Sequence, residues 1–109
     1  MTKRIPEIIL ALDVDNRKQA VKILKETGEK LQWVKVGLQS YLRDGPDLVR
    51  TIADSGKKVF LDLKLHDIPN TMAKAIESLA KLPIDMLTLH AHCGEEALKR
   101  CAETGKEFL

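Results

Sequence analysis

Residues 59–69 read VFLDLKLHDIP, which places three charged side chains within and just after a strongly apolar run. The apolar residues indicate a buried strand that is covered on both faces, as in a parallel sheet. Because strand side chains alternate, Asp62 and Lys64 share one face, and the leucines that flank them share the other. A buried charge that is left unpaired destabilises a protein by several kcal/mol. We therefore interpret this strand as the floor of an active site.

The same pattern of apolar strand and amphipathic helix recurs along the 109 residues. The predicted strands are Ile8–Val14, Trp33–Leu38, Lys58–Leu65 and Asp85–His90. The first predicted helix runs from Arg17 to Thr27, and the second begins at Pro46 and is closed by Gly56. The third begins after Asn70 and is ended by Pro83, and the fourth begins near Gly94 and stops near Gly105. Four β/α units of this kind call for a parallel sheet with right-handed crossovers.

Two architectures accept this alternation, an open doubly wound sheet and part of a (β/α)₈ barrel. The turn after the first strand, Asp13-Val14-Asp15-Asn16, contains no glycine, and no glycine-rich phosphate loop occurs in the sequence. Polar residues instead follow the strands at their C-terminal ends, where barrel enzymes carry their chemistry. A whole barrel needs about 250 residues. We therefore predict an α/β fold, the first half of a TIM-type barrel, with residues 1–109 in one domain.

Composition excludes several classes of function. A formal net charge of +2 with scattered lysines and arginines gives no case for nucleic acid. No apolar run approaches the roughly 18 residues that cross a membrane. Cys93 and Cys101 follow neither a zinc spacing nor a disulfide framework, which favours a reduced, cytoplasmic compartment. His90 and His92, on one predicted strand face, lack a third ligand, so we favour a histidine pair in the core or at the rim over a metal site.

The second predicted strand adds another charge to the first two. Lys35 lies between the first and third strands, from which it is expected to approach Asp13 and Asp62. An ammonium that is fixed over a substrate carbon is a proton donor, and a fixed carboxylate supplies electrostatic stress. The alternative to a catalytic role for Asp62, Lys64 and Asp67 is that they form an ion-pair network that only stabilises the fold. Asp67 and Thr71 follow on a loop that Pro69 restricts, and this loop is able to face a neighbouring subunit.

These residues resemble the orotidine 5′-phosphate decarboxylase family. The hallmark Asp-x-Lys-x-x-Asp is present as Asp62, Lys64 and Asp67, and it is followed by Ile-Pro-Asn-Thr at 68–71 as in bacterial members. Ala-Leu-Asp at 11–13 and Val-Lys-Val-Gly at 34–37 also agree with the family. The similarity extends over essentially the whole chain.

The resemblance implies conversion of orotidine 5′-monophosphate to uridine 5′-monophosphate, without metal or organic cofactor, in a homodimer. It implies that Lys64 protonates the C6 carbanion, that Asp62 lies near the scissile carboxylate, and that Asp67 and Thr71 reach the partner's site. Catalytic roles are thus implied for Lys35, Asp62, Lys64 and Asp67. Substrate-binding positions are implied at Asp13, Lys35, Asp62, Leu63, Lys64, Leu65, His66, Asp67, Ile68, Pro69, Asn70 and Thr71. The family's remaining pyrimidine contact and its phosphate-binding arginine fall beyond Leu109, so the chain alone is expected to be inactive.

Two other functions stay open. One is that of the magnesium-dependent decarboxylases and aldolases of keto-sugar phosphates, which resemble this chain in the third-strand motif. On the second strand, however, these enzymes have an acidic metal ligand where this chain has Lys35. A lysine there would repel a divalent cation. The other alternative is a half-barrel assembly module without catalysis, because four strands leave two unpaired edges that invite pairing with another chain.

Overall fold

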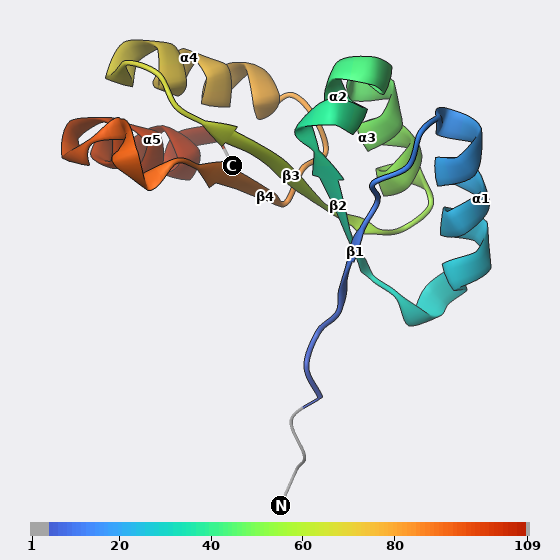
Figure 1. Cartoon of the computed structure of the whole chain (residues 1–109). Coiled ribbons are helices and arrows are strands. Elements are labelled where there is room, and N and C mark those ends of the chain that lie inside the picture. Colours follow the sequence, from blue (N-terminus) through green and yellow to red (C-terminus); the bar gives the residue numbers. More distant parts are fainter. Residues whose placement is uncertain (1–4, 109) are drawn as a thin grey trace, which may run out of the picture.

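A computed structural model describes residues 5–108, in which four strands alternate with helices (Figure 1). The strands are β1 (Ile9–Ala11), β2 (Trp33–Gly37), β3 (Lys58–Leu65) and β4 (Met86–Leu89). The α-helices are α1 (Arg17–Thr27), α2 (Leu38–Asp44), α3 (Pro46–Asp54), α4 (Pro69–Leu79) and α5 (Glu95–Phe108). Two short 3₁₀ helices, η1 (Gly28–Lys30) and η2 (Ala91–Cys93), complete the described elements. Within residues 5–108, no helix combines the length and hydropathy that crossing a bilayer requires.

The four strands form one parallel sheet in the order β1-β2-β3-β4. Spatial order therefore follows chain order, as it does around a (β/α)₈ barrel, whereas in a doubly wound sheet the order reverses partway. The register places Lys35 between Ala11 and Phe60, and it places Gly37 beside Asp62. The predicted α/β fold, with four parallel strands alternating with helices, is confirmed.

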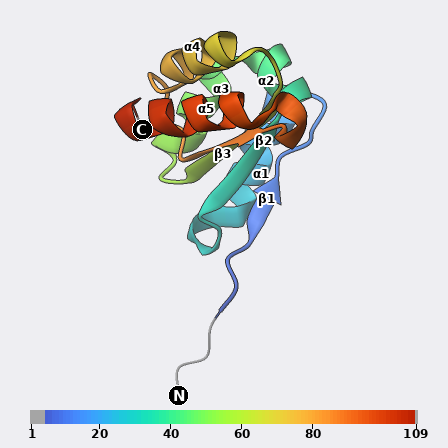
Figure 2. The same ribbon diagram turned by 90° about the vertical axis from the view of Figure 1, so that its left-hand side faces the viewer.

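One face of the sheet carries the hydrophobic core. Val34, Val36, Val59 and Leu61 have no exposed surface, because α1, α3 and α4 pack against them. At the other end of the sheet, α4 and α5 run side by side and enclose a second cluster around Met72 (Figure 2). The helices thus cover the same face, as crossovers of one hand require.

The opposite face of the sheet is open in the described structure. It carries Ile9, Trp33, Phe60 and Met86, all of them half-buried or exposed. The expectation that β3 is covered on both faces was therefore wrong for residues 5–108, where helices pack on one face of this strand only. On the open face, Asp62 is the one β3 residue that is itself buried, at 8% exposure.

The helix boundaries follow local sequence signals in some cases and depart from them in others. α1 begins after Asn16, whose side chain accepts a hydrogen bond from the Gln19 amide at 2.9 Å, and it ends at Gly28 with a φ of 56°. α2 was not predicted, because its seven residues directly follow β2 without a side-chain cap. α4 begins at Pro69 and its N-cap is Ile68, so the expected start after Asn70 was wrong. α5 continues through Gly105 instead of stopping there.

Lys57 is a buried cation that holds the N-terminal end of the sheet together. Its ammonium donates to the carbonyl oxygens of Gly28 and Leu31, each at 2.6 Å, which lie just beyond α1. We expect Lys57→Met to lower the free energy of unfolding by about 2 kcal/mol, because two carbonyl groups lose a charged donor. Urea unfolding of the chain measures this, and Lys22→Met on the exposed side of α1 is the matched control. Equal unfolding midpoints for the two variants would contradict the assignment.

Candidate active site

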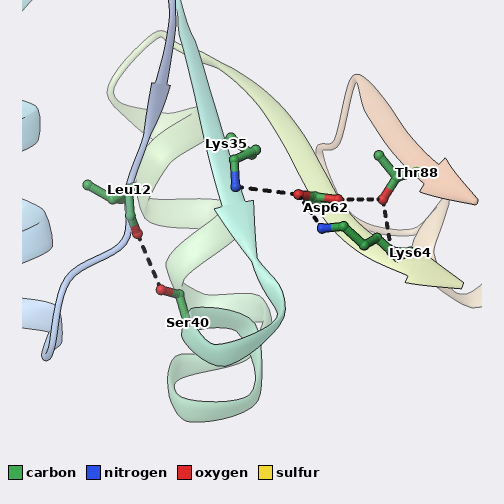
Figure 3. Close-up of polar contacts among 6 residues, drawn as sticks. All are labelled: Leu12, Lys35, Ser40, Asp62, Lys64 and Thr88. Atoms are coloured by element: carbon green, nitrogen blue, oxygen red, sulfur yellow. Dashed lines mark hydrogen bonds and ion pairs between the residues drawn. The ribbon is translucent and has the colours of Figure 1, made fainter.

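The centre of the candidate site is the carboxylate of Asp62, on the open face of β3 (Figure 3). Its Oδ2 accepts from the ammonium of Lys64 at 2.9 Å and from that of Lys35 at 3.4 Å. Its Oδ1 accepts from the hydroxyl of Thr88 on β4 at 2.7 Å. Three strands thus supply donors to one carboxylate. Lys35, Asp62 and Lys64 of the predicted charge array come together, whereas Asp13 does not join them and Thr88 was not predicted.

Strand register accounts for this convergence. Lys35 is two residues before Gly37, which pairs with Asp62, so its long side chain extends along the sheet toward the carboxylate. Lys64 lies two residues after Asp62 on the same face. The Lys35 side chain is 24% exposed and that of Lys64 is 67% exposed, so the two ammonium groups differ in their access to solvent. Of the two, Lys64 is the more accessible to a ligand on this face.

Asp13 lies next to this array without joining it. No ion pair within the described chain links Asp13 to Lys35. Gly37 separates the two groups: a β-carbon added at Gly37 would lie 3.4 Å from Asp13 Oδ1 and 3.9 Å from Lys35 Nζ. The glycine therefore leaves open a gap between an exposed carboxylate and an ammonium, in which both groups are free to contact a polar ligand.

Two residues of α2 hold the end of β1, where Asp13 lies. The buried hydroxyl of Ser40 donates to the carbonyl oxygen of Leu12 at 3.3 Å (Figure 3). Arg43 donates to the carbonyl oxygen of Val14 at 2.6 Å and also pairs with Asp44. Sequence analysis missed both contacts because it did not predict α2.

The surroundings of Asp62 favour its charged form. The hydrogen bond from Lys64 lowers the pKa of the Asp62 carboxyl below its ordinary value, and the hydrogen bonds from Thr88 and Lys35 act in the same direction. Partial burial opposes them, but its effect is smaller than their sum. Asp62 therefore stays a carboxylate throughout the neutral range.

This lowered pKa predicts an acid-dependent contribution to stability. A carboxyl whose pKa is lower in the folded than in the unfolded chain stabilises the fold above its unfolded pKa, about 3.9 for aspartate. That stabilisation is lost as the pH falls through the folded pKa. We expect the difference in unfolding free energy between the chain and Asp62→Asn to shrink below about pH 4.

Chemical denaturation at a series of pH values measures that difference. The control repeats the series after Lys64→Met is introduced into both the unsubstituted chain and Asp62→Asn, because Lys64 is the largest cause of the lowered Asp62 pKa. The pH dependence should then weaken. A constant difference from pH 7 down to pH 3 would contradict the prediction.

The loop after β3 carries the remaining predicted site residues. Asp67 is exposed, and its Oδ1 accepts from the Ile68 amide at 2.7 Å, so it does not enter the Asp62 array within this chain. Thr71 is exposed in the first turn of α4, and it lines a shallow hollow together with Lys64, His66 and Asp67. Both side chains are thus available to another molecule at the C-terminal end of the sheet.

The other residues of the predicted run differ in where they lie. Leu63 and Leu65 are half-buried against the core on the helix-covered face, so their side chains point away from Asp62. Ile68 is 65% exposed. Pro69 is the first residue of α4, and the side chain of Asn70 accepts a hydrogen bond from Arg100 on α5. The structure therefore divides the run 62–71 into charged residues on the open face, core leucines and an exposed loop.

The chain's three histidines gather beyond the ends of β3 and β4. The rings of His66 and His90 stack at a centroid distance of 4.6 Å, and His92 lies 5.1 Å from His90. His92 belongs to η2 and not to a strand, so the expectation that His90 and His92 share a strand face was wrong. Among residues 5–108, no three potential ligand side chains come together as a metal site.

Thr88 is the site residue that sequence analysis missed. A threonine in a predicted strand is ordinary, and only the neighbouring strand reveals that its hydroxyl meets Asp62. The available signal was alternation: Thr88 and Met86 lie on the same face of β4, so a polar residue on the open face stood opposite the predicted charges.

Comparison with known proteins places this geometry in context. Residues 6–109 match the family described as "Orotidine 5'-phosphate decarboxylase / HUMPS family". An orotidine 5′-phosphate decarboxylase from Opitutus terrae is 48% identical over 101 residues, which are 93% of this chain and 44% of that protein.

Solved structures agree with this match. Orotidine 5′-phosphate decarboxylase from Lactobacillus acidophilus superposes with a TM-score of 0.81 at 40% identity, over 90% of this chain and 44% of that one. Orotidine 5′-monophosphate decarboxylase from Methanocaldococcus jannaschii, complexed with inhibitor BMP, superposes with a TM-score of 0.87 at 30% identity. The superposition covers 95% of this chain and 49% of that one. The chain thus spans about half the length of the relatives that it matches.

Proposed function

The chain belongs to the orotidine 5′-phosphate decarboxylase / HUMPS family, and from this premise we propose that it carries the charged half of a decarboxylase active site. The proposed reaction converts orotidine 5′-monophosphate to uridine 5′-monophosphate and carbon dioxide. The observation that carries the proposal is the position of Asp62, whose carboxylate is paired with two ammonium groups on the open face of the sheet.

The proposed mechanism uses each charge for one task. The carboxylate of Asp62 lies beside the substrate's carboxylate, and repulsion between the two anions favours loss of carbon dioxide. The electron pair of the broken C–C bond stays on C6 of the pyrimidine. Lys64 then transfers a proton from its ammonium to C6, and it recovers a proton from solvent, to which its side chain is 67% exposed.

Asp13 and Lys35 are proposed to bind the ribose hydroxyls of the substrate. The gap beside Gly37 supports this assignment, because a carboxylate and an ammonium there offer an acceptor and donors at neighbouring positions. The remaining contacts are proposed to come from outside this chain. We propose that residues 1–109 form the N-terminal half of one barrel domain. We also propose that the chain alone binds the substrate's phosphate poorly and has negligible turnover. The ends of that range, residues 1–4 and 109, lie outside the described residues.

The test joins this chain to the C-terminal remainder of the Opitutus terrae relative, in place of the 101 matched residues. The purified chimera is assayed for loss of orotidine 5′-monophosphate and release of carbon dioxide, with the intact relative as positive control. Turnover by the chimera, and none by the 109-residue chain, is the expected result. A chimera with the relative's circular dichroism spectrum but no turnover would overturn the proposal.

The same chimera separates the proposal from the magnesium-dependent alternative. Lys35 Nζ lies 3.4 Å from Asp62 Oδ2, so a divalent cation bound to this carboxylate would face an ammonium at close range. We therefore propose that activity is retained after treatment with EDTA. Activity that is lost with EDTA and restored by Mg²⁺ would favour the alternative.

A second candidate function is assembly without catalysis. The open face and the unpaired outer edges of β1 and β4 favour it, because two copies of a four-stranded sheet are able to close an eight-stranded barrel. Mass measurement during size-exclusion chromatography, combined with a titration of inhibitor BMP, tests this candidate. A stable dimer of the chain without affinity for the inhibitor would support assembly.

A further inference from the structure

Thr88 connects Asp62 and Lys64 of β3 through a single hydroxyl group. The hydroxyl donates to Asp62 Oδ1 at 2.7 Å and accepts from the backbone N–H of Lys64 at 2.8 Å (Figure 3). One contact orients a carboxylate side chain, and the other fixes the backbone from which the ammonium side chain extends. No other side chain among residues 5–108 makes a hydrogen bond to both residues.

The pairing of β3 with β4 is irregular at this position. Leu61 pairs with Leu87 and Leu65 pairs with Leu89, so three residues of β3 lie opposite Thr88 alone. Within this bulge Lys64 has a φ of 50°, a left-handed conformation that residues other than glycine rarely adopt. Because the regular ladder is interrupted, the Lys64 N–H has a side-chain oxygen as its partner in place of a backbone carbonyl.

From these contacts we propose that Thr88 is a positioning residue for the decarboxylation proposed above. Its hydroxyl sets the orientation of the Asp62 carboxylate and the backbone of Lys64 at the same time. The inference rests on the proposed function for its catalytic consequence, whereas the positioning itself is a property of the described chain. Nothing in the sequence motif of the third strand points to this residue.

The hydroxyl is suited to this task because it is donor and acceptor at once. The Lys64 N–H occupies a lone pair of the oxygen, which leaves the hydroxyl hydrogen to point at Asp62. Valine has nearly the same shape as threonine and also favours strands, but it offers neither contact. Serine keeps both contacts and lacks only the methyl group. The pair of variants therefore separates hydrogen bonding from packing.

The first test uses the 109-residue chain without any substrate. We expect Thr88→Val to speed hydrogen exchange of the Lys64 amide and to raise the pKa of the Asp62 carboxyl, both followed by NMR. Thr88→Ser should resemble the unsubstituted chain in both measurements. Thr104→Val, on α5, is the matched control, because its hydroxyl donates only within its own helix. Unchanged exchange and an unchanged Asp62 pKa in Thr88→Val would overturn the proposal.

The second test measures turnover in the chimera described above. Thr88→Val is expected to lower kcat about 10- to 100-fold, the effect of losing a hydrogen bond to a charged group. Thr88→Ser should recover most of that loss, and Thr104→Val should leave kcat unchanged. A loss in Thr88→Val that serine does not rescue would assign Thr88 a packing role only.

The tests distinguish failure of the decarboxylase assignment from failure of the positioning role of Thr88. An inactive but folded chimera would overturn the decarboxylase assignment, while the exchange and titration measurements on the chain would still decide whether Thr88 positions the pair. If Thr88→Val does not fold, Thr88→Cys takes its place, because a thiol is a weak donor and a weak acceptor. Exchange and titration in Thr88→Cys that equal those of the unsubstituted chain would then overturn the proposal.

Discussion

Lys64→Ala in the chimera is expected to lower kcat for orotidine 5′-monophosphate by about 10³-fold or more, because it removes both the proton donor and a charge at the reacting carbon. The fold should survive, since the Lys64 side chain is 67% exposed and contributes no core packing. Single-turnover assays of substrate loss, with the protein in excess over substrate, measure the rate of the chemical step.

The matched control for this variant is Lys74→Ala on α4, which removes an exposed lysine that pairs with Glu77. Its turnover should equal that of the unsubstituted chimera. If Lys64→Ala turned over substrate at a rate close to that of the control, another group would have to protonate C6. The proposed mechanism would then be wrong at its central step.

Asp67→Ala is expected to abolish turnover as strongly as Lys64→Ala, for a different reason. Asp67 stands outside the Asp62 array of its own chain, on an exposed loop, which fits a residue that completes the site of a partner subunit. We propose that the chimera is a homodimer in which Asp67 of one subunit completes the site of the other. When the two inactive variants are mixed after unfolding and refolded together, each mixed dimer then contains one site with both groups intact. Random pairing makes half of the dimers mixed, so about a quarter of all sites should recover.

The measurement is turnover as a function of mixing ratio, which should peak at equal amounts of the two variants. Each variant refolded by itself is the control and should stay inactive. No recovery in the mixture, while size-exclusion chromatography shows that mixed dimers have formed, would place Asp67 in its own subunit's site or outside the site.

The sequence predicted the elements of this fold because its local signals agree with one another. The bounds of α1 and β3 match their predicted ranges. A capping asparagine with a terminal glycine defines the first, and apolar residues at every second position define the second. Strand order followed from chain order once a barrel-type winding was assumed. α2 was not predicted because a seven-residue helix that starts directly after a strand has no separate start signal.

The charged pair of the candidate site was predictable for a similar reason. Alternation on β3 put Asp62 and Lys64 on one face, and adjacency of strands brought Lys35 to them. The contribution of Thr88 was not predictable, because it depends on the irregular register between β3 and β4. Asp13 was expected to contact Lys35, but the structure leaves a gap beside Gly37, because the distance between side chains on neighbouring strands depends on rotamers that sequence does not specify.

The left-handed backbone at Lys64 has a consequence for how this segment is able to change over evolutionary time. Glycine adopts that conformation freely, whereas a lysine there holds roughly 1 kcal/mol or more of strain. Drift toward higher thermal tolerance would thus favour glycine at a position where the proposed chemistry demands an amine. Under the proposed function, heat resistance and turnover therefore place opposite demands on this one residue.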